Sequence, residues 1–272
     1  MITRKQFGPA WYEEKNIKST NYYKTKFQIE NNLKLCTLGE ISYMPIFKQL
    51  RKEKISMLPH LAISEHVDFL NIYNSLVTIN KFYSLKSLML ASSLRAHGKS
   101  LITILLAKIF STMGQRVLLI DTDLRNPCIR HRLRIKPNKG LSDLLTYSEL
   151  NWKDLIYPIS DNLKVISEGQ QELRPREWSD LLCSIQMDKL MNSIHIDNSF
   201  DIILYDTATI LGLNDSNLIA KNVDGVILLT VLNYIDCDLI KETLVHLKKQ
   251  NAFILGSILN NLPRQKLVQN LV

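Results

Sequence analysis

Short, nearly all-apolar runs alternate with longer segments of helical periodicity from residue 61 onward, and this alternation limits the possible fold more than any other feature. Such runs are typical of parallel strands that are buried on both faces and joined by helical crossovers. We predict strands at residues 87–92, 116–121, 163–167, 201–206, 225–231 and 253–259. Helices are predicted at residues 63–78, 99–112, 141–147, 177–196, 214–221 and around 240–247. The sequence therefore predicts an α/β fold, a doubly wound and mostly parallel sheet with helices on both faces.

Positive charge is concentrated at the start of the chain. Residues 1–60 hold 11 Lys and Arg against 5 Asp and Glu, a net charge of +6, whereas the whole chain carries +8. We therefore divide the chain into a basic leader, residues 1–60, and a globular domain, residues 61–272. The leader is interpreted as a solvated, partly flexible segment, with contact to an anionic membrane surface as the alternative. Nucleic acid is not expected as a partner, because no sequence-reading motif accompanies the charge.

The sequence gives no reason to expect a membrane span or an export signal. No window reaches the roughly 18 apolar residues of a membrane helix, and the first thirty residues lack an apolar signal core. Four cysteines, Cys36, Cys128, Cys183 and Cys237, are too far apart for a CxxC pair. We expect a soluble, cytoplasmic protein with reduced thiols.

The first strand of the domain leads into a glycine-lysine-serine loop. The loop reads SSLRAHGKS from Ser92 to Ser100, and an apolar helix follows at once. Backbone N–H groups at the helix start can face a triphosphate, Lys99 can reach the β- and γ-oxygens, and Ser100 can ligate Mg²⁺. A standard phosphate loop has glycine where this chain has Ser93, and it favours small residues where His97 lies. A coincidental strand-to-helix turn is therefore the alternative interpretation.

Three acids follow predicted strands at the same edge of the sheet. Asp121 and Asp123 end the second strand in VLLIDTDLRNP, and Asp206 ends the fourth in DIILYDT. Each acid alone could be a helix cap. Together with Lys99 they form a set that suits Mg²⁺ and phosphoryl transfer, which needs positioned charge rather than covalent chemistry from the protein.

These motifs resemble those of the bacterial protein-tyrosine kinases that work with polysaccharide co-polymerases in capsule and exopolysaccharide production. SSLRAHGKS resembles their Walker A motif, VLLIDTDLRNP their Walker A′ and IILYD their Walker B. The similarity continues in KGLSDLLTYSE, EWSDLLCSIQMDKLM, DTATILGLNDSNLIAKNVDGVILL and GSILN. In the leader, NNLKLCTLGEISYMP resembles the family's juxtamembrane linker. The resemblance covers most of residues 33–262.

The resemblance implies a P-loop fold of the MinD/ParA-like superfamily, ATP and Mg²⁺ as cofactors, and transfer of the γ-phosphoryl group to tyrosine. Lys99, Asp121 and Asp123 become the catalytic set, with Asp121 as base or activator of metal-bound water. Ser100, Asp123 and Asp206 become the metal ligands, and Asn260 a contact to adenine. The implied nucleotide-binding residues are Ser93, Ala96, His97, Gly98, Lys99, Ser100, Leu101, Arg125 and Asn260.

Several positions depart from the family pattern. Arg95, Ala96 and His97 replace proline, glycine and glutamate of the phosphate loop, which puts nucleotide affinity in question. The family's ring-forming helix carries a glutamate followed by two arginines at three-residue steps, whereas this chain has Glu65, Asp68 and Asn71. A homo-oligomeric ring through that contact is not expected. The last tyrosine is Tyr234, so no terminal tyrosine cluster for phosphorylation in trans is expected.

Two other functions remain open beside the kinase. The first is a nucleotide-binding regulator without catalysis, which docks on a membrane co-polymerase and sets polysaccharide chain length or export. The second is a partition-type ATPase, against which Leu94 argues, because that class has a second lysine five positions before the phosphate lysine. The resemblance implies a membrane chain-length protein as partner and a place at the inner face of the plasma membrane. A basic patch of Arg125, Arg130, Arg132 and Arg134 could meet phosphates or an acidic partner loop, or form an ordinary solvated helix face.

Overall fold

A computed structural model describes residues 21–42, 67–95, 97–147, 149–170, 175–211 and 215–261 of this protein. The strands are β1 Thr37–Ile41, β2 Ser87–Ser92, β3 Val117–Asp121, β4 Tyr157–Pro158, β5 Leu163–Ile166, β6 Ile202–Asp206, β7 Gly225–Val231 and β8 Ile254–Asn260. The helices are α1 Lys26–Leu33, α3 Val67–Tyr83, α4 Lys99–Thr112, α5 Ile129–Leu133, α6 Leu141–Thr146, the 3-10 helix η3 Trp152–Leu155, α7 Pro175–Leu182, α8 Ile185–Ile196, α9 Asp215–Ala220 and α10 Cys237–Lys249.

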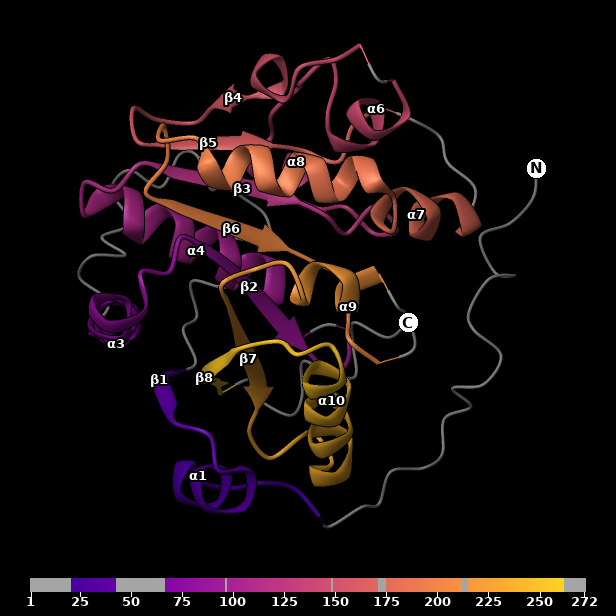
Figure 1. The fold of residues 1–272 in the computed structure, drawn as a ribbon. Coiled ribbons are helices and arrows are strands. Elements are labelled where there is room, and N and C mark those ends of the chain that lie inside the picture. The colour runs from indigo at the N-terminus through magenta and orange to yellow at the C-terminus, as the bar shows by residue number, and fades with distance from the viewer. Residues whose placement is uncertain are drawn as a thin grey trace.

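The strands form one sheet in the order β1-β8-β7-β2-β6-β3-β5-β4 (Figure 1). Every neighbouring pair is parallel except β4 and β5, which are antiparallel. Strand β2, the first strand of the domain, is flanked by β6 and β7 and so lies near the middle of the sheet. The carboxyl end of β2 therefore lies at the switch point where doubly wound sheets hold their ligands. The six predicted strands and the predicted α/β fold are confirmed.

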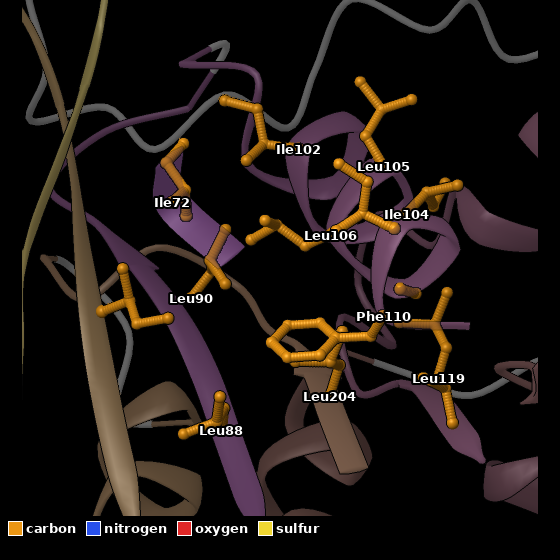
Figure 2. Close-up of a cluster of buried hydrophobic side chains, with 14 of the residues drawn as sticks. Ile72, Leu88, Leu90, Ile102, Ile104, Leu105, Leu106, Phe110, Leu119 and Leu204 are labelled. Atoms are coloured by element: carbon orange, nitrogen blue, oxygen red, sulfur yellow. The ribbon is translucent and has the colours of Figure 1, made fainter. Parts of the chain in front are cut away.

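Helices cover both faces of the sheet. On one face, α3 and α4 pack on β2, β3 and β6, and Figure 2 shows Leu106 and Phe110 of α4 over Leu204 and Leu90. The rings of Tyr73 and Phe110 meet edge to face at 5.2 Å and join the two helices. Residues of α6, α8 and α9 occupy the other face. Full burial of each such aliphatic side chain contributes about 1.5–3 kcal/mol, so this core holds the strand ends in place.

Part of the leader is packed onto the domain instead of being solvated. Strand β1 adds to the sheet by parallel pairing with β8. Ile29 and Leu33 of α1 are buried in a cluster with Ile240 and Leu244 of α10. The expectation of a solvated segment is therefore wrong for residues 21–42, because their apolar side chains complete the core beside β8. The boundary at residue 60 stays a prediction, and residues 1–20 and 43–66 lie outside the described residues.

One predicted helix is wrong as a single element. The helix expected at residues 177–196 is two helices, α7 and α8, that meet at Ser184. The Ser184 hydroxyl accepts a hydrogen bond from the Met187 amide at 3.2 Å, so it caps the second helix.

In the described part of the chain, no helix has the length and apolar character that crossing a membrane requires. All four cysteines are free thiols.

Candidate nucleotide-binding site

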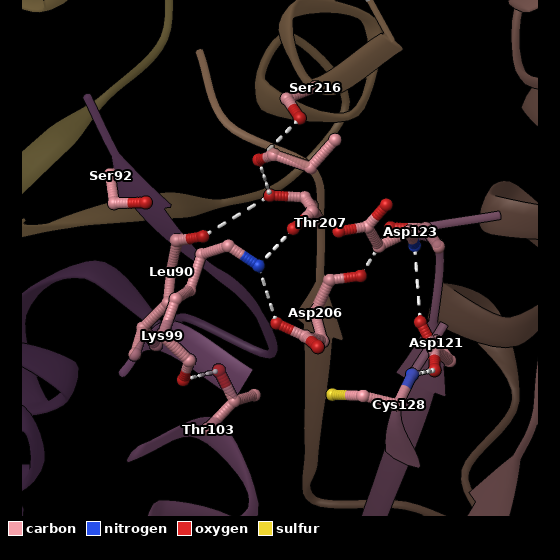
Figure 3. Close-up of polar contacts among 12 residues, drawn as sticks. Leu90, Ser92, Lys99, Thr103, Asp121, Asp123, Cys128, Asp206, Thr207 and Ser216 are labelled. Carbon is pink, nitrogen blue, oxygen red and sulfur yellow. Dashed lines mark hydrogen bonds and ion pairs between the residues drawn. The ribbon is translucent and has the colours of Figure 1, made fainter. Parts of the chain in front are cut away.

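The site lies at the carboxyl ends of β2, β6 and β3, which are adjacent in the sheet. The strand register pairs Asp206 with Leu90 on one side and with Asp121 on the other. This register brings the two strand-end acids side by side, and the loop after β2 brings Lys99 to the same edge (Figure 3). The convergence predicted for Lys99, Asp121, Asp123 and Asp206 is therefore present in the fold.

The phosphate loop ends in an uncapped helix N-terminus. Gly98 has a φ of +86°, a left-handed conformation that suits glycine, and helix α4 begins directly after it without a side-chain cap. The first N–H groups of α4 therefore have no side-chain partner. Unpaired N–H groups at a helix N-terminus bind phosphate well, because they add to the positive end of the helix dipole.

Asn260, at the end of β8, supports this loop from the other side. Its Nδ2 donates to the His97 carbonyl at 2.9 Å. Its Oδ1 and both ring nitrogens of His97 are buried without a hydrogen-bond partner among the described residues. Burial lowers the pKa of His97 to about 4, so the imidazole is neutral at pH 7. The predicted contact of Asn260 to adenine stays a prediction.

Lys99 reaches across to the end of β6. Its Nζ lies 2.7 Å from Asp206 Oδ1 and also donates to the Thr207 carbonyl. Both side chains of the pair are buried, with 8% and 0% of their surfaces exposed. Burial opposes the charge of Lys99, but the nearby carboxylates of Asp206, Asp123 and Asp121 outweigh it and raise its pKa. The ammonium group is therefore charged and fixed toward the acids.

Asp121 is the most enclosed of the three acids. Its Oδ1 accepts from the Asp123 amide at 3.1 Å, and its Oδ2 accepts from the amides of Cys128 and Ile129 at 3.2 and 3.1 Å. Burial and the charge of Asp206 raise its pKa well above that of an ordinary aspartate. A raised pKa is suitable for a group that must accept a proton near neutral pH.

Asp123 is more accessible than Asp121 and Asp206. Its side chain is partly buried, and its Oδ1 accepts from the Asn126 amide at 3.1 Å. Burial raises the pKa of Asp123, while the charge of Lys99 opposes that shift. The two aspartates of the β3 loop thus differ in access: Asp121 organises the backbone, and Asp123 can face a ligand.

The predicted magnesium ligands fit the ion. Asp206 Oδ2 is buried and has no hydrogen-bond partner among the described residues, so a carboxylate oxygen at this edge lacks a partner. Ser100 stands in the first turn of α4 and Asp123 on the neighbouring strand end. One hydroxyl and two carboxylates are a normal protein contribution to Mg²⁺, which also takes phosphate and water oxygens. The described residues hold no complete group of three or more His, Cys, Asp or Glu ligands.

Two predicted nucleotide contacts have other partners. Arg125 Nε lies 2.5 Å from Asp215 Oδ2, and its Nη2 donates to Ser179 Oγ at 2.7 Å. Its guanidinium also lies 5.3 Å from the Trp178 ring centroid. Leu101 is buried in the core below the loop. Ala96 lies outside the described residues, and the nucleotide contacts of all nine residues stay predictions.

Glu168 is a further acid at this edge of the sheet that the sequence motifs do not indicate. It follows β5 and has a side chain 10% exposed, with Oε1 2.8 Å from Arg130 Nε. Its Oε2 is buried without a partner among the described residues, and its charge contributes to the raised pKa of Asp121. The available signal was an acid directly after the predicted strand 163–167. Cys128, also near the site, has its pKa raised to about 11 by burial, so it is a protonated thiol.

The family model described as "CobQ/CobB/MinD/ParA nucleotide binding domain" matches residues 95–272, more than half of the chain. The chain belongs to this CobQ/CobB/MinD/ParA family. CapB of Staphylococcus aureus is 28% identical over 212 residues, which are 76% of this chain and 88% of CapB. Tyrosine-protein kinase YwqD of Bacillus subtilis is 27% identical over 176 residues, 65% of this chain and 72% of YwqD.

Other members are longer proteins. ExoP of Rhizobium meliloti, a succinoglycan biosynthesis transport protein, is 28% identical over 63% of this chain, which spans only 22% of ExoP. Among solved structures, the BceF tyrosine kinase domain has a TM-score of 0.75 over 89% of this chain and 100% of that domain, at 21% identity. The predicted resemblance to bacterial tyrosine kinases and the P-loop fold are confirmed.

Proposed function

We propose that this chain binds Mg²⁺-ATP at the carboxyl edge of its sheet and transfers the γ-phosphoryl group to a tyrosine hydroxyl. The observation that carries the proposal is the Lys99–Asp206 pair, buried beside Asp121 and directly below the uncapped start of α4. The CobQ/CobB/MinD/ParA family description names a nucleotide binding domain and no reaction, so membership alone does not select a kinase. Relatives named tyrosine-protein kinases support that choice.

Each residue has a role that follows from its surroundings. The N–H groups at the start of α4 and the Lys99 ammonium would hold the phosphates. Ser100, Asp123 and Asp206 would hold the Mg²⁺ ion, which when bound neutralises phosphate charge. Asp121, with its raised pKa, would take up the proton of the acceptor hydroxyl.

The test is phosphotyrosine formation by the purified chain with Mg²⁺ and ATP, together with calorimetric titration of ATP. Lys99→Met should lower phosphorylation by about a hundredfold or more, because it removes a positioned charge at the transferred group. The matched control is Lys241→Met, since Lys241 also pairs with an aspartate, Asp238, but on the surface of α10. Phosphotyrosine formation that is unchanged in Lys99→Met would disprove the proposal.

A nucleotide-binding regulator without catalysis is the second candidate. It is favoured by Arg95 and His97, which replace proline and glutamate of the family's phosphate loop and so alter the loop that would position the γ-phosphoryl group for transfer. ATP binding without phosphotyrosine, under any activator, would support this candidate.

We further propose that the chain acts in capsule or exopolysaccharide production beside a membrane chain-length protein, at the inner face of the membrane. Support comes from ExoP, whose name places it in succinoglycan biosynthesis and transport. Co-purification of the chain with membranes only when its co-polymerase is co-expressed would test this partnership.

A further inference from the structure

A stretch of chain beside the site is strongly basic. Residues 130–139 (RHRLRIKPNK), here called the basic segment, contain five Arg and Lys, one His and no acid. Leu133, Ile135 and Pro137 are buried, whereas Arg134, Lys136, Lys139 and His131 are exposed. The apolar residues therefore fix the segment to the body of the domain, and the charged side chains face solvent.

The basic segment is pinned along the carboxyl edge of the sheet. Just before it, the amides of Cys128 and Ile129 donate to Asp121, at the end of β3. Just after it, the Leu141 amide donates to the Ser167 carbonyl at 2.8 Å, at the end of β5. In between, Gln170 Nε2 donates to the Pro137 carbonyl at 2.9 Å. The segment thus runs from the proposed catalytic acids outward to β5.

The acids beside the segment already have ion-pair or hydrogen-bond partners. Glu168 pairs with Arg130, and Asp143 Oδ2 accepts the amides of Gly140 and Gln170 at 2.8 and 3.0 Å. Within the part of the chain that the structure describes, Lys136 and Lys139 form no ion pair. Positive charge without a nearby counter-charge attracts an anionic partner and repels a cationic one.

We infer that the basic segment is the docking surface for the acceptor polypeptide and that it selects tyrosines flanked by acidic residues. The inference rests on the proposed kinase function and adds its substrate class. A tyrosine hydroxyl placed at Asp123 and Asp121 leaves its flanking residues beside the segment, because Cys128 and Ile129, which lead into the segment, are hydrogen-bonded to Asp121. Acidic flanks would meet Lys136 and Lys139 there, and basic flanks would be repelled.

Other anionic partners fit less well. The segment has no aromatic side chain for stacking on bases, which single-stranded nucleic acid binding normally uses. The described residues between Met113 and Tyr147 include no exposed large apolar side chain that could enter a membrane surface. An acidic polypeptide needs neither feature, only charge placed beside the site.

The test is fluorescence anisotropy of labelled tyrosine peptides of equal length with Glu, Ser or Lys flanks, titrated with the full chain. The acidic peptide should bind about tenfold tighter than the Ser peptide, a difference that rising salt weakens. Lys136→Glu with Lys139→Glu should weaken that binding about tenfold, since two attractions become repulsions. The matched control, Lys248→Glu with Lys249→Glu, reverses two exposed lysines at the far end of α10 and should change affinity less than about twofold.

Three results would overturn the inference: no binding of any peptide, equal affinity for acidic and basic flanks, or no effect of the Lys136 and Lys139 reversal. Competition that favours RNA or phosphatidylserine vesicles over the acidic peptide would also overturn it. Thermal unfolding of both double variants would check that they fold. Because the binding assay needs no catalysis, tight acidic-peptide binding without phosphotyrosine would refute the kinase alone. Equal phosphorylation of acidic and basic peptides would refute the inference alone.

Discussion

The hydroxyl groups of Ser93 and Thr243 lie 2.8 Å apart and join the phosphate loop to helix α10. Both side chains are fully buried, and the Thr243 hydroxyl also donates to the Leu239 carbonyl at 2.8 Å. Thr243 has a single hydroxyl hydrogen. When it donates that hydrogen to the Leu239 carbonyl, the Ser93 hydroxyl is the donor in the bond to Thr243. Ser93 stands where a standard loop has glycine, so its hydroxyl adds an anchor that glycine would lack.

Removal of both hydroxyl groups should destabilise the chain by less than the sum of the two single losses, because the two groups share one hydrogen bond. We expect Ser93→Ala to lower the free energy of unfolding by about 1 kcal/mol, because it removes this buried hydrogen bond, and Thr243→Val to lower it by more, because it also removes the bond to the Leu239 carbonyl. The double variant should lose little more than Thr243→Val alone, giving a coupling of about 1 kcal/mol in urea denaturation. Ser75→Ala, which removes an exposed hydroxyl from α3, is the control. Simple additivity of the two losses would show that the contact contributes nothing.

The Lys99–Asp206 pair gives a second prediction. Lys99→Met should lower the free energy of unfolding by about 3–5 kcal/mol, because it leaves Asp206 buried and unpaired. Adding Asp206→Asn should restore most of that loss without restoring phosphorylation, since the uncompensated charge is gone but the phosphate lysine and a proposed Mg²⁺ ligand are both missing. Chemical denaturation and the kinase assay on both variants separate the two effects. A double variant less stable than Lys99→Met would contradict this account.

The sequence predicted the strands and the edge where the acids meet, because both depend on local patterns. Buried apolar runs identify strands wherever they lie in a sheet, and parallel strands place their following residues at one edge. Asp206 and Asp121 were therefore grouped correctly without knowledge of strand order. Helix α4 was also predicted with its bounds, residues 99–112.

What the sequence could not give are contacts between distant segments. The packing of Ile29 on α10 and the bond from Ser93 to Thr243 depend on tertiary placement, which no periodicity encodes. The pairing of Arg125 with Asp215 likewise requires α9 to lie next to the β3 loop. The helix that corresponds to the ring contact of the resembled family is only partly described: Glu65 lies outside, and Asp68 accepts from the Ser42 amide at 2.8 Å.

His97 should make the chain less stable in mild acid. Its pKa is about 4 in the folded chain against 6.5 for an ordinary imidazole, so the unfolded chain binds more protons between these values. Stability should therefore fall as the pH drops from 6.5 toward 4, by about 2 kcal/mol between pH 7 and pH 5. His97→Leu should abolish this part of the pH dependence, and His131→Gln, an exposed position, should retain it. Parallel urea titrations at pH 7 and 5 measure this change in the free energy of unfolding. An equal change in wild type and His97→Leu would be the contrary result.

Two arginine–aspartate pairs in this chain have similar geometry and different burial. Arg125 lies 2.5 Å from Asp215, with 17% and 2% of the side chains exposed, and Arg116 lies 2.6 Å from Asp201, with 51% and 41% exposed. We expect Arg125→Ala to cost about 3 kcal/mol, because it leaves the buried Asp215 without its counter-charge and removes the contact with Trp178. Arg116→Ala should cost less than about 1 kcal/mol, because water solvates the exposed Asp201 and screens the pair. Urea denaturation of both variants checks this order, and comparable losses would mean that burial does not set the strength of these pairs.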